Sequence, residues 1–252
     1  GLPYGISNKS GQTTPGEVGK ILDTAIANNL EVLDSASAYG NSENILGQND
    51  LSYFKMLSKF MPPQDEPISI QLDNSLKNLG LTSLYGYLAH RPIEILKDPG
   101  QWEELQKFKE TGKVQKIGFS LNEPEELEQL LSNNFFPDLV QVPFNYFDRR
   151  FESAIKDLKS KGCEVHTRSA FLQGLFFMDT HKLPEYFDEV KPFLKQFQKM
   201  ESLNGALLKF VLEKSFIDKV IIGVENEAQL LQNINGIEKA SSLPELKETI
   251  SN

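Results

Sequence analysis

The sequence predicts an α/β protein with a parallel sheet, folded as a (β/α)₈ TIM barrel. Short apolar runs rich in Val, Ile, Leu and Phe alternate along the chain with longer amphipathic stretches. Repeated strand–helix units of this kind imply parallel strands that are covered on both faces. The sequence has no Gly-rich turn between a strand and a helix, which would mark an open dinucleotide-binding sheet. Its absence favours the barrel over the alternative, a doubly wound sheet.

Seven segments have the length and composition of buried parallel strands. Eight strands are needed to close a barrel of this kind, and the first predicted strand comes only after a helix. We therefore expect the opening strand of the barrel to be missing from the given chain. The predicted strands are Glu31–Ser35, Tyr53–Lys59, Leu84–His90, Val114–Ser120, Leu139–Pro143, Glu164–Ser169 and Lys219–Gly223.

Helices are predicted between these strands from apolar residues at helical spacing and from the residues at their ends. Pro15 lies at the start of the first helix, where proline is tolerated, and Gly80 and Gly112 follow two later helices as C-terminal stops. No linker divides the chain, so residues 1–252 are expected to form a single domain. The predicted helices are Thr14–Asn29, Pro67–Leu79, Trp102–Thr111, Glu123–Leu131, Arg149–Ser160, Glu201–Lys214 and Glu225–Lys239.

The overall charge and the cysteine count exclude several classes of protein. The formal net charge of −9 argues against a nucleic-acid binder, which needs a basic face, and against docking on anionic membranes. Cys163 is the one cysteine, so an intramolecular disulfide and a thiolate metal cluster are excluded. No apolar run reaches the roughly 18 residues of a membrane span. These features predict a cytoplasmic enzyme without a metal, nucleic-acid or membrane partner.

Polar side chains follow three successive predicted strands, at the point where each strand ends. Asp34 and Tyr39 follow the first strand, Lys59 ends the second, and His90 ends the third. The carboxyl ends of barrel strands converge on one face, so these four side chains are expected to meet. Taken singly, each has an ordinary structural explanation, such as a helix cap for Asp34 or a solvated charge for Lys59. Their joint occurrence at one predicted face favours a catalytic site.

The four residue types together suit the reduction of a carbonyl group. A tyrosine has a reference pKa near 10 and is a poor acid at neutral pH, but a nearby ammonium lowers that pKa. Lys59 is expected to supply the ammonium, and Asp34 to hold it in place. His90 is expected to orient a carbonyl oxygen by a hydrogen bond. Tyr39 then acts as the general acid that protonates this oxygen while a hydride reaches the carbon.

The same residues carry a resemblance to a known family. Residues 34–40 read Asp-Ser-Ala-Ser-Ala-Tyr-Gly, which resembles the Asp-x-Ala-x-x-Tyr-Gly signature of the aldo-keto reductases. The order Asp, Tyr, Lys, His along the chain is also that of the family. Residues 112–120, 140–145 and 220–224 resemble later strands of its barrel, so the resemblance covers nearly the whole chain. It implies a small-molecule carbonyl substrate and NADPH or NADH as cofactor.

The resemblance also implies which residues bind the cofactor. Ser120 and Gln141 are expected to bond the nicotinamide carboxamide, and Arg168 lies where many members place an aromatic ring that stacks on the nicotinamide. Leu121 departs from the family, which often has Asn there. The remaining cofactor contacts are expected from Ser169, Phe171, Gly223, Glu225, Gln229 and Asn233.

Two finer expectations concern the cofactor and the substrate. Members that prefer NADP usually place Lys, Ser or Arg after the last strand, whereas this chain has Glu225 and Glu227, which would repel a 2′-phosphate. This favours NAD. Residues 168–174 resemble a bacterial branch with poorly defined substrates, some of which act in sugar-nucleotide or surface-polysaccharide pathways. A sugar-like carbonyl is therefore expected.

Two other functions remain as alternatives. The first is a non-catalytic nicotinamide-nucleotide-binding subunit or redox sensor, against which the complete set of Tyr39, Lys59 and His90 argues, because a pure binder needs no proton donor. The second is another barrel enzyme, such as a sugar-phosphate isomerase. That reaction needs a carboxylate base and a Gly-rich phosphate site after the last strands, and the sequence shows no such phosphate site.

Overall fold

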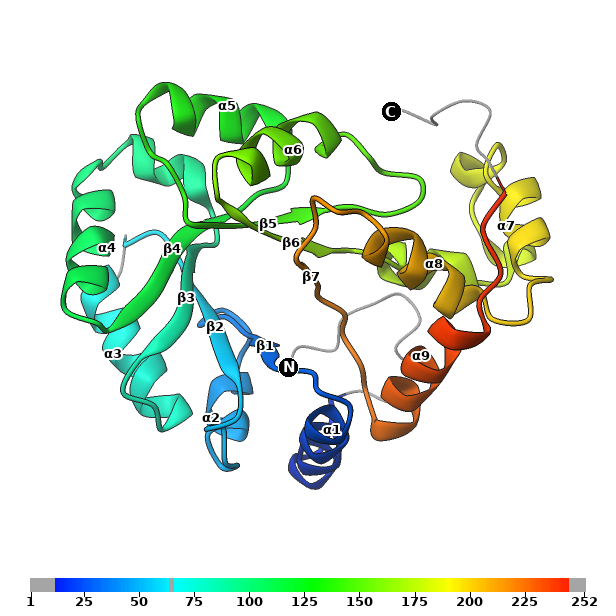
Figure 1. Ribbon diagram of the computed structural model, residues 1–252, viewed down its shortest axis with the longest axis horizontal. Helices are drawn as coiled ribbons and strands as arrows, with labels where there is room; N and C mark the ends of the chain where they lie inside the picture. Colours follow the sequence, from blue (N-terminus) through cyan, green and yellow to red (C-terminus); the bar gives the residue numbers. More distant parts are fainter. Residues whose placement is uncertain (1–11, 64–65, 245–252) are drawn as a thin grey trace.

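The computed structural model describes residues 12–63 and 66–244, which form one sheet of seven parallel strands in the order β1 to β7. Figure 1 shows the sheet curling on itself with the helices on its outside, which confirms the predicted α/β barrel-type fold. All seven predicted strands are present, and β4 and β5 have the predicted bounds. The strands are β1 Val32–Asp34, β2 Lys55–Phe60, β3 Leu84–Ala89, β4 Val114–Ser120, β5 Leu139–Pro143, β6 Glu164–Arg168 and β7 Lys219–Val220.

The helices follow from local signals in the sequence. Thr14 caps the first helix by accepting a hydrogen bond from the amide of Glu17, and Gly80 ends the third with a left-handed φ of 67°. The helices are α1 Pro15–Ala27, α2 Ser42–Leu46, α3 Ile68–Leu79, α4 Gly100–Glu110, α5 Pro124–Ser132, α6 Glu152–Ser160, α7 Lys191–Phe197, α8 Leu203–Leu212 and α9 Glu227–Lys239. Short 3₁₀ segments are η1 Pro92–Leu96, η2 Leu172–Phe177, η3 Thr180–Lys182 and η4 Glu185–Phe187.

Two of these helices, α2 and α7, were not predicted from the sequence. Each helix has fewer than two full turns. A repeat of apolar residues every 3.6 positions cannot be recognised in so short a segment. The omission of α2 matters most, because this helix directly follows the loop that carries Tyr39.

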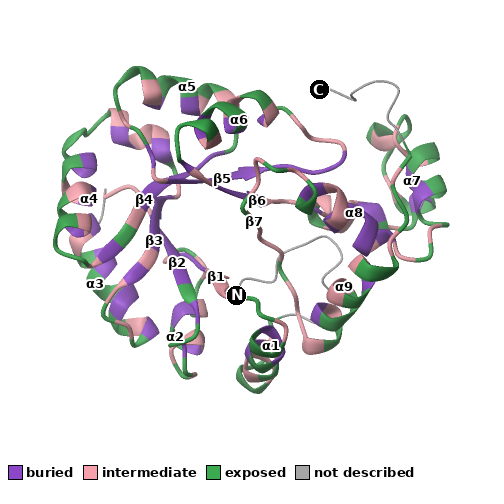
Figure 2. Cartoon of the chain, in the orientation of Figure 1, coloured by how far each residue is buried: buried purple, intermediate pink, exposed green. Residues whose placement is uncertain are grey.

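Two apolar layers hold the curled sheet. The larger fills the space between the strands and the surrounding helices, and Figure 2 shows buried residues along the strands and on the inner sides of the helices. A smaller cluster, formed by Leu57, Leu88 and Leu139, fills the inside of the sheet. Gly118 in β4 allows β5 to approach, because a Cβ at this position would lie 1.7 Å from the carbonyl oxygen of Leu139. None of the helices in the described part of the chain has the length and apolarity needed to cross a bilayer.

In the described part of the chain, helices rather than a strand lie between the two edges of the sheet. Among the described residues, β1 and β7 are the edge strands and do not pair with each other. Helices α1 and α9 lie side by side below this gap (Figure 1). The hydroxyl of Thr24 donates to the Glu227 carboxylate at 2.9 Å, and the amide of Glu227 donates to the Glu17 carboxylate at 2.9 Å. These two hydrogen bonds hold the start of α9 against the side of α1.

A polar network occupies the amino ends of the strands, opposite the mouth where Asp34 and Lys59 lie. The Glu164 carboxylate accepts hydrogen bonds from Tyr85 at 2.6 Å and from the ammonium of Lys116, and its other oxygen lies 2.6 Å from Nε2 of His166. Burial raises the pKa of Glu164, but these three partners together outweigh burial and hold the pKa well below its ordinary value. Glu164 is therefore ionised at neutral pH.

Candidate active site

The first three strands place the predicted catalytic residues at one mouth. Asp34 ends β1, Lys59 is the next-to-last residue of β2, and His90 directly follows β3. These strands are adjacent and parallel, so their carboxyl ends lie next to one another. The amide of Ser37 donates to the carbonyl of Lys59 at 3.0 Å, which fixes the start of the loop that carries Tyr39.

Lys59 and Asp34 form an ion pair inside this mouth. The ammonium of Lys59 lies 2.5 Å from Oδ2 of Asp34 and donates a second hydrogen bond, at 2.9 Å, to the carbonyl of Ser35. The Lys59 side chain is 0% exposed and that of Asp34 is 9% exposed. A charge buried to this degree is tolerated only when it is paired and hydrogen-bonded, so the position of the ammonium is tightly determined.

Tyr39 and His90 lie beside this ion pair. The ammonium of Lys59 is 5.1 Å from the centre of the Tyr39 ring, and the Tyr39 and His90 rings are 5.7 Å apart in an edge-to-face arrangement. Burial, reinforced by the charge of Lys59, lowers the pKa of His90 to about 4. His90 is therefore a neutral imidazole at neutral pH, and its buried Nδ1 has no hydrogen-bond partner among the described residues.

Gln141 links the far side of the sheet to the ion pair. Its Nε2 donates to Oδ1 of Asp34 at 2.9 Å, across the interior from β5 to β1. Ser120 pairs with Gln141 in the register of β4 and β5 and is 4% exposed. The two residues expected to bind a carboxamide thus lie together and next to Asp34.

Arg168 ends β6 and leans toward β4. Its Nη2 donates to the carbonyl of Leu121 at 2.9 Å and to Oδ1 of Asn122 at 2.6 Å, while Nη1 donates to the Ser169 hydroxyl at 3.3 Å. Leu121, which departs from the Asn that the resemblance would predict, is fully buried, and the side-chain amide oxygen of the next residue, Asn122, accepts from Arg168. Ser169 adopts a left-handed φ of 65°, which turns the chain sharply after the strand.

Several of the remaining residues expected to contact the cofactor are engaged in contacts within the protein. Gln229 accepts from the amide of Glu225 at 2.8 Å, and Asn233 accepts from the side chain of Asn204 at 3.1 Å. Gly223 has no atom within 4 Å of a Cβ built on it, so space is open there. Phe171 contacts the ring of Phe177 at 5.5 Å between centres.

A second set of polar contacts, not predicted from the sequence, ties α2 to the strands. The hydroxyl of Ser58 donates to the Glu43 carboxylate at 2.5 Å, and the hydroxyl of Ser35 donates to that of Ser42 at 3.1 Å. Glu43 is only 4% exposed. These bonds hold both ends of the Tyr39 loop against β1 and β2. The sequence signal for these contacts is Glu43, an acidic residue in the first turn of α2. It was not used because α2 itself was not predicted.

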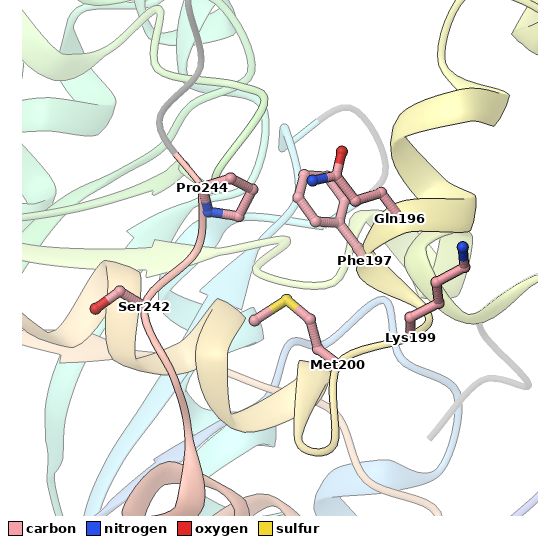
Figure 3. A pocket seen from close by; sticks show the side chains of 6 residues that line it. All are labelled: Gln196, Phe197, Lys199, Met200, Ser242 and Pro244. Carbon is pink, nitrogen blue, oxygen red and sulfur yellow. The ribbon is translucent and has the colours of Figure 1, made fainter.

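Other chemistry-bearing features do not belong to this mouth. A cavity of about 420 Å³ lies between α7 and the chain near Pro244, and Figure 3 shows Phe197 and Met200 facing it, with Lys199 as its one titratable side chain. Burial raises the pKa of Cys163 to about 12, so its thiol is not a nucleophile at neutral pH. Within the described ranges, no group of three or more His, Cys, Asp or Glu side chains is placed to hold a metal ion.

Comparison with solved structures shows the same fold. An aldo-keto reductase from Bacillus halodurans, in its apo form, superposes with a TM-score of 0.75 at 20% identity, over 96% of this chain and 87% of that one. An aldo-keto reductase from Klebsiella pneumoniae in complex with NADPH superposes with a TM-score of 0.69 at 19% identity, over 91% of this chain and 81% of that one.

Comparison of sequences shows the family. The glyoxal reductase of Bacillus subtilis (strain 168) is 27% identical over 167 residues, which are 63% of this chain and 59% of that enzyme. The chain thus matches less than two thirds of the length of this curated relative. The model of the aldo/keto reductase family matches residues 4–248. Because this match spans nearly the whole chain, the protein belongs to the aldo/keto reductase family.

Proposed function

We propose that this protein is an NAD(P)H-dependent reductase that converts an aldehyde or ketone into the alcohol, with Tyr39 as general acid. The observation that carries the proposal is the buried Lys59 ammonium, 2.5 Å from Asp34 and 5.1 Å from the centre of the Tyr39 ring. Membership of the aldo/keto reductase family supports the class of reaction.

The reaction adds a hydride to the carbonyl carbon and a proton to the carbonyl oxygen. When bound, a reduced nicotinamide dinucleotide supplies the hydride with its two electrons and becomes oxidised. Tyr39 breaks its O–H bond and gives the proton to the oxygen as the C=O double bond becomes single. The ammonium of Lys59 stabilises the phenolate that remains, and Asp34 keeps that ammonium charged and in place. Solvent returns a proton to the phenolate between turnovers.

His90 positions the carbonyl group rather than supplying the proton. With its pKa lowered to about 4, the imidazole is neutral at the pH of the cell interior and has one N–H to donate. A neutral donor can hold a carbonyl oxygen near Tyr39 without competing with it as an acid. The edge-to-face contact between the two rings supports this arrangement.

The residues present fit a nicotinamide carboxamide. The buried Nδ1 of His90, whose ring lies beside that of Tyr39, has no hydrogen-bond partner among the described residues. Buried polar atoms in proteins are almost always hydrogen-bonded, so an orphaned one at a mouth suits a polar ligand. Ser120 and the amide oxygen of Gln141 would hold the carboxamide, and the planar guanidinium of Arg168 would lie against the nicotinamide ring.

We further propose that the enzyme prefers NADH. The contact between Glu227 and Thr24 directs that carboxylate to α1, so the repulsion of a 2′-phosphate rests on Glu225, two residues before the start of α9. For the substrate we propose a sugar-like carbonyl compound, as expected from the sequence. The relative from Bacillus subtilis bears the name glyoxal reductase, which supports including small dicarbonyl compounds in any test.

The test is a fluorescence titration with NADH and NADPH, followed by turnover of a carbonyl panel with sugars and glyoxals. We expect binding and turnover by the wild type. Tyr39→Phe is expected to lower kcat by about 10²-fold or more with unchanged dinucleotide affinity. Binding without turnover of any carbonyl would instead favour the alternative, a non-catalytic nucleotide-binding subunit.

A further inference from the structure

A second polar cavity, of about 240 Å³, lies between α2 and α3, beside the loop that carries Tyr39. Its lining includes Ser37 and Gly40 from that loop, together with two acids, Glu43 and Glu66. None of the residues that line the cavity is basic. The cavity is therefore a negatively charged space next to the loop of the proposed general acid.

Glu43 is a buried carboxylate without a cationic partner. It accepts a hydrogen bond from the neutral hydroxyl of Ser58 at 2.5 Å, and among the described residues it forms no ion pair. Lys59, the next residue of β2, is already paired with Asp34 at 2.5 Å. Buried carboxylates in proteins are normally paired with a cation or bound to a metal ion. The negative charge of Glu43 is thus left to be matched from the cavity.

Glu66 brings a second carboxylate to the same cavity. Its backbone is held by Gln71, whose Nε2 donates to the carbonyl of Glu66 at 2.8 Å and to that of Met61 at 3.0 Å. Its carboxylate accepts a hydrogen bond from the side chain of Asn74 at 3.0 Å, and no cation in residues 12–63 or 66–244 pairs with it. Glu43 and Glu66 therefore bring two unmatched negative charges to one space.

The hydroxyl of Ser75 is independent evidence for a polar ligand there. Ser75 is 1% exposed and lines the cavity from α3, yet its Oγ has no hydrogen-bond partner in the part of the chain that the structure describes. Buried polar atoms are almost always hydrogen-bonded. The buried hydroxyl of Tyr87 also lacks such a partner, and its pKa is raised by burial first, then by the charges of Glu43 and Glu66. Unmatched charge and an unmatched hydroxyl thus occur together.

We propose that this cavity binds a hard divalent cation, Mg²⁺ or Ca²⁺, through the carboxylates of Glu43 and Glu66, with the Ser75 hydroxyl bonded to its water shell. Such cations prefer oxygen ligands, and Mg²⁺ in particular keeps several waters and is held by one or two carboxylates. The two carboxylates match the charge of one ion. At about 240 Å³ the cavity has room for bound water, because one water molecule takes about 30 Å³.

This inference does not depend on the proposed reductase function, and its test measures binding and stability. The full chain is first freed of divalent cations with EDTA and kept in KCl at about 0.15 M, which screens exposed charges. We expect MgCl₂ or CaCl₂ at about 10 mM, above the Kd of about 10⁻³ M of weak sites, to raise Tm by about 3 °C or more. Isothermal titration calorimetry should show a single ion bound to each chain.

Four variants assign the ion to the cavity. Glu43→Gln and Glu66→Gln should each weaken binding at least about tenfold, because each removes one of the two charges that hold the ion. Ser75→Ala should weaken it about threefold, through the loss of one hydrogen bond to bound water. Glu128→Gln is the matched control, since it removes an exposed carboxylate of α5 and should leave binding unchanged. Glu66 is only half-buried, so Glu66→Gln tests the site even if Glu43→Gln fails to fold.

Two results would overturn the inference. In the first, neither cation raises Tm or gives saturable heat in the wild type at about 10 mM, well above the affinity of weak sites. In the second, Glu66→Gln and Glu128→Gln bind the ion as tightly as the wild type does, which places the ion elsewhere on this acidic protein. A chain that binds the ion through Glu66 and reduces no carbonyl would support the cation site while refuting the proposed reductase function.

Discussion

Gln141 donates a hydrogen bond from Nε2 to Oδ1 of Asp34 at 2.9 Å, while the other oxygen of the same carboxylate binds the ammonium of Lys59 at 2.5 Å. Both oxygens of Asp34 are therefore engaged, one from β5 across the interior and one from the neighbouring strand. Gln141 was expected to bind the nicotinamide carboxamide. The structure shows that the same side chain also orients the acid that holds Lys59.

Gln141→Leu is therefore expected to affect more than cofactor binding. Loss of a hydrogen bond to a charged group costs about 1.5–3 kcal/mol, so the free energy of unfolding should fall by that amount. Dinucleotide affinity and kcat should fall together, because one side chain serves both the carboxamide and Asp34. Urea titration, fluorescence binding and steady-state rates measure the three effects.

The control for this variant is Gln129→Leu, which changes an exposed glutamine on α5. It should leave all three measurements close to those of the wild type. A Gln141→Leu protein with weaker dinucleotide binding and wild-type stability would show that the bond to Asp34 contributes nothing to the fold.

Lys59→Met should be damaging in two separable ways. Removal of the ammonium leaves Asp34 as a nearly buried, unpaired carboxylate, which typically costs 3–5 kcal/mol, about the range expected here. The same change removes the group that stabilises the Tyr39 phenolate, so kcat should fall by about 10²-fold or more. Thermal unfolding and carbonyl turnover measure the two losses.

The double variant Asp34→Asn with Lys59→Met separates stability from catalysis. The double variant has no unpaired charge at this position, so its free energy of unfolding should be closer to that of the wild type than that of Lys59→Met is. Its turnover should stay as low as that of Lys59→Met. Recovery of turnover in the double variant would mean that the ammonium has no part in proton donation by Tyr39.

His90 should make stability depend on pH in a defined window. Its pKa is about 4 in the folded protein and 6.5 in the unfolded chain, so the unfolded chain binds a proton first as the pH falls. The contribution is fully present above about pH 6.5 and is lost between that pH and about pH 4, by at most about 3 kcal/mol. His90→Asn should flatten the unfolding free energy across this window relative to the wild type. Identical pH dependence in both proteins would place the imidazole in an ordinary aqueous environment.

Glu164 should be the main structural acid at the amino ends of the strands. Glu164→Leu removes the common partner of Lys116, His166 and Tyr85 and should lower the free energy of unfolding by about 3–5 kcal/mol. KM for the carbonyl should not change, because this network lies at the end of the sheet opposite Tyr39.

The control for Glu164 is an exposed ion pair. Glu152→Gln breaks the pair that Glu152 forms with Lys156 on the surface of α6, and it should cost about 0.5 kcal/mol or less. The depressed pKa of Glu164 adds a second measurement. Its stabilisation should be present above about pH 4.5 and decline as the pH falls below that value. Equal losses in the two variants would argue against a special role for the network.

The order of the strands and the grouping of Asp34, Tyr39, Lys59 and His90 were predictable from sequence. Alternating apolar and amphipathic segments require parallel strands, and parallel strands place the residues at their carboxyl ends together. This grouping depends on chain direction and apolar period alone. It needs no knowledge of side-chain contacts, which is why it holds even where predicted strand ends differ from those observed.

The partner of each polar group was decided by tertiary structure. Sequence alone does not show that Gln141 reaches Asp34, that Glu43 binds Ser58, or that Glu227 turns toward Thr24. Each of these bonds joins residues from different elements, and its length depends on how the elements pack.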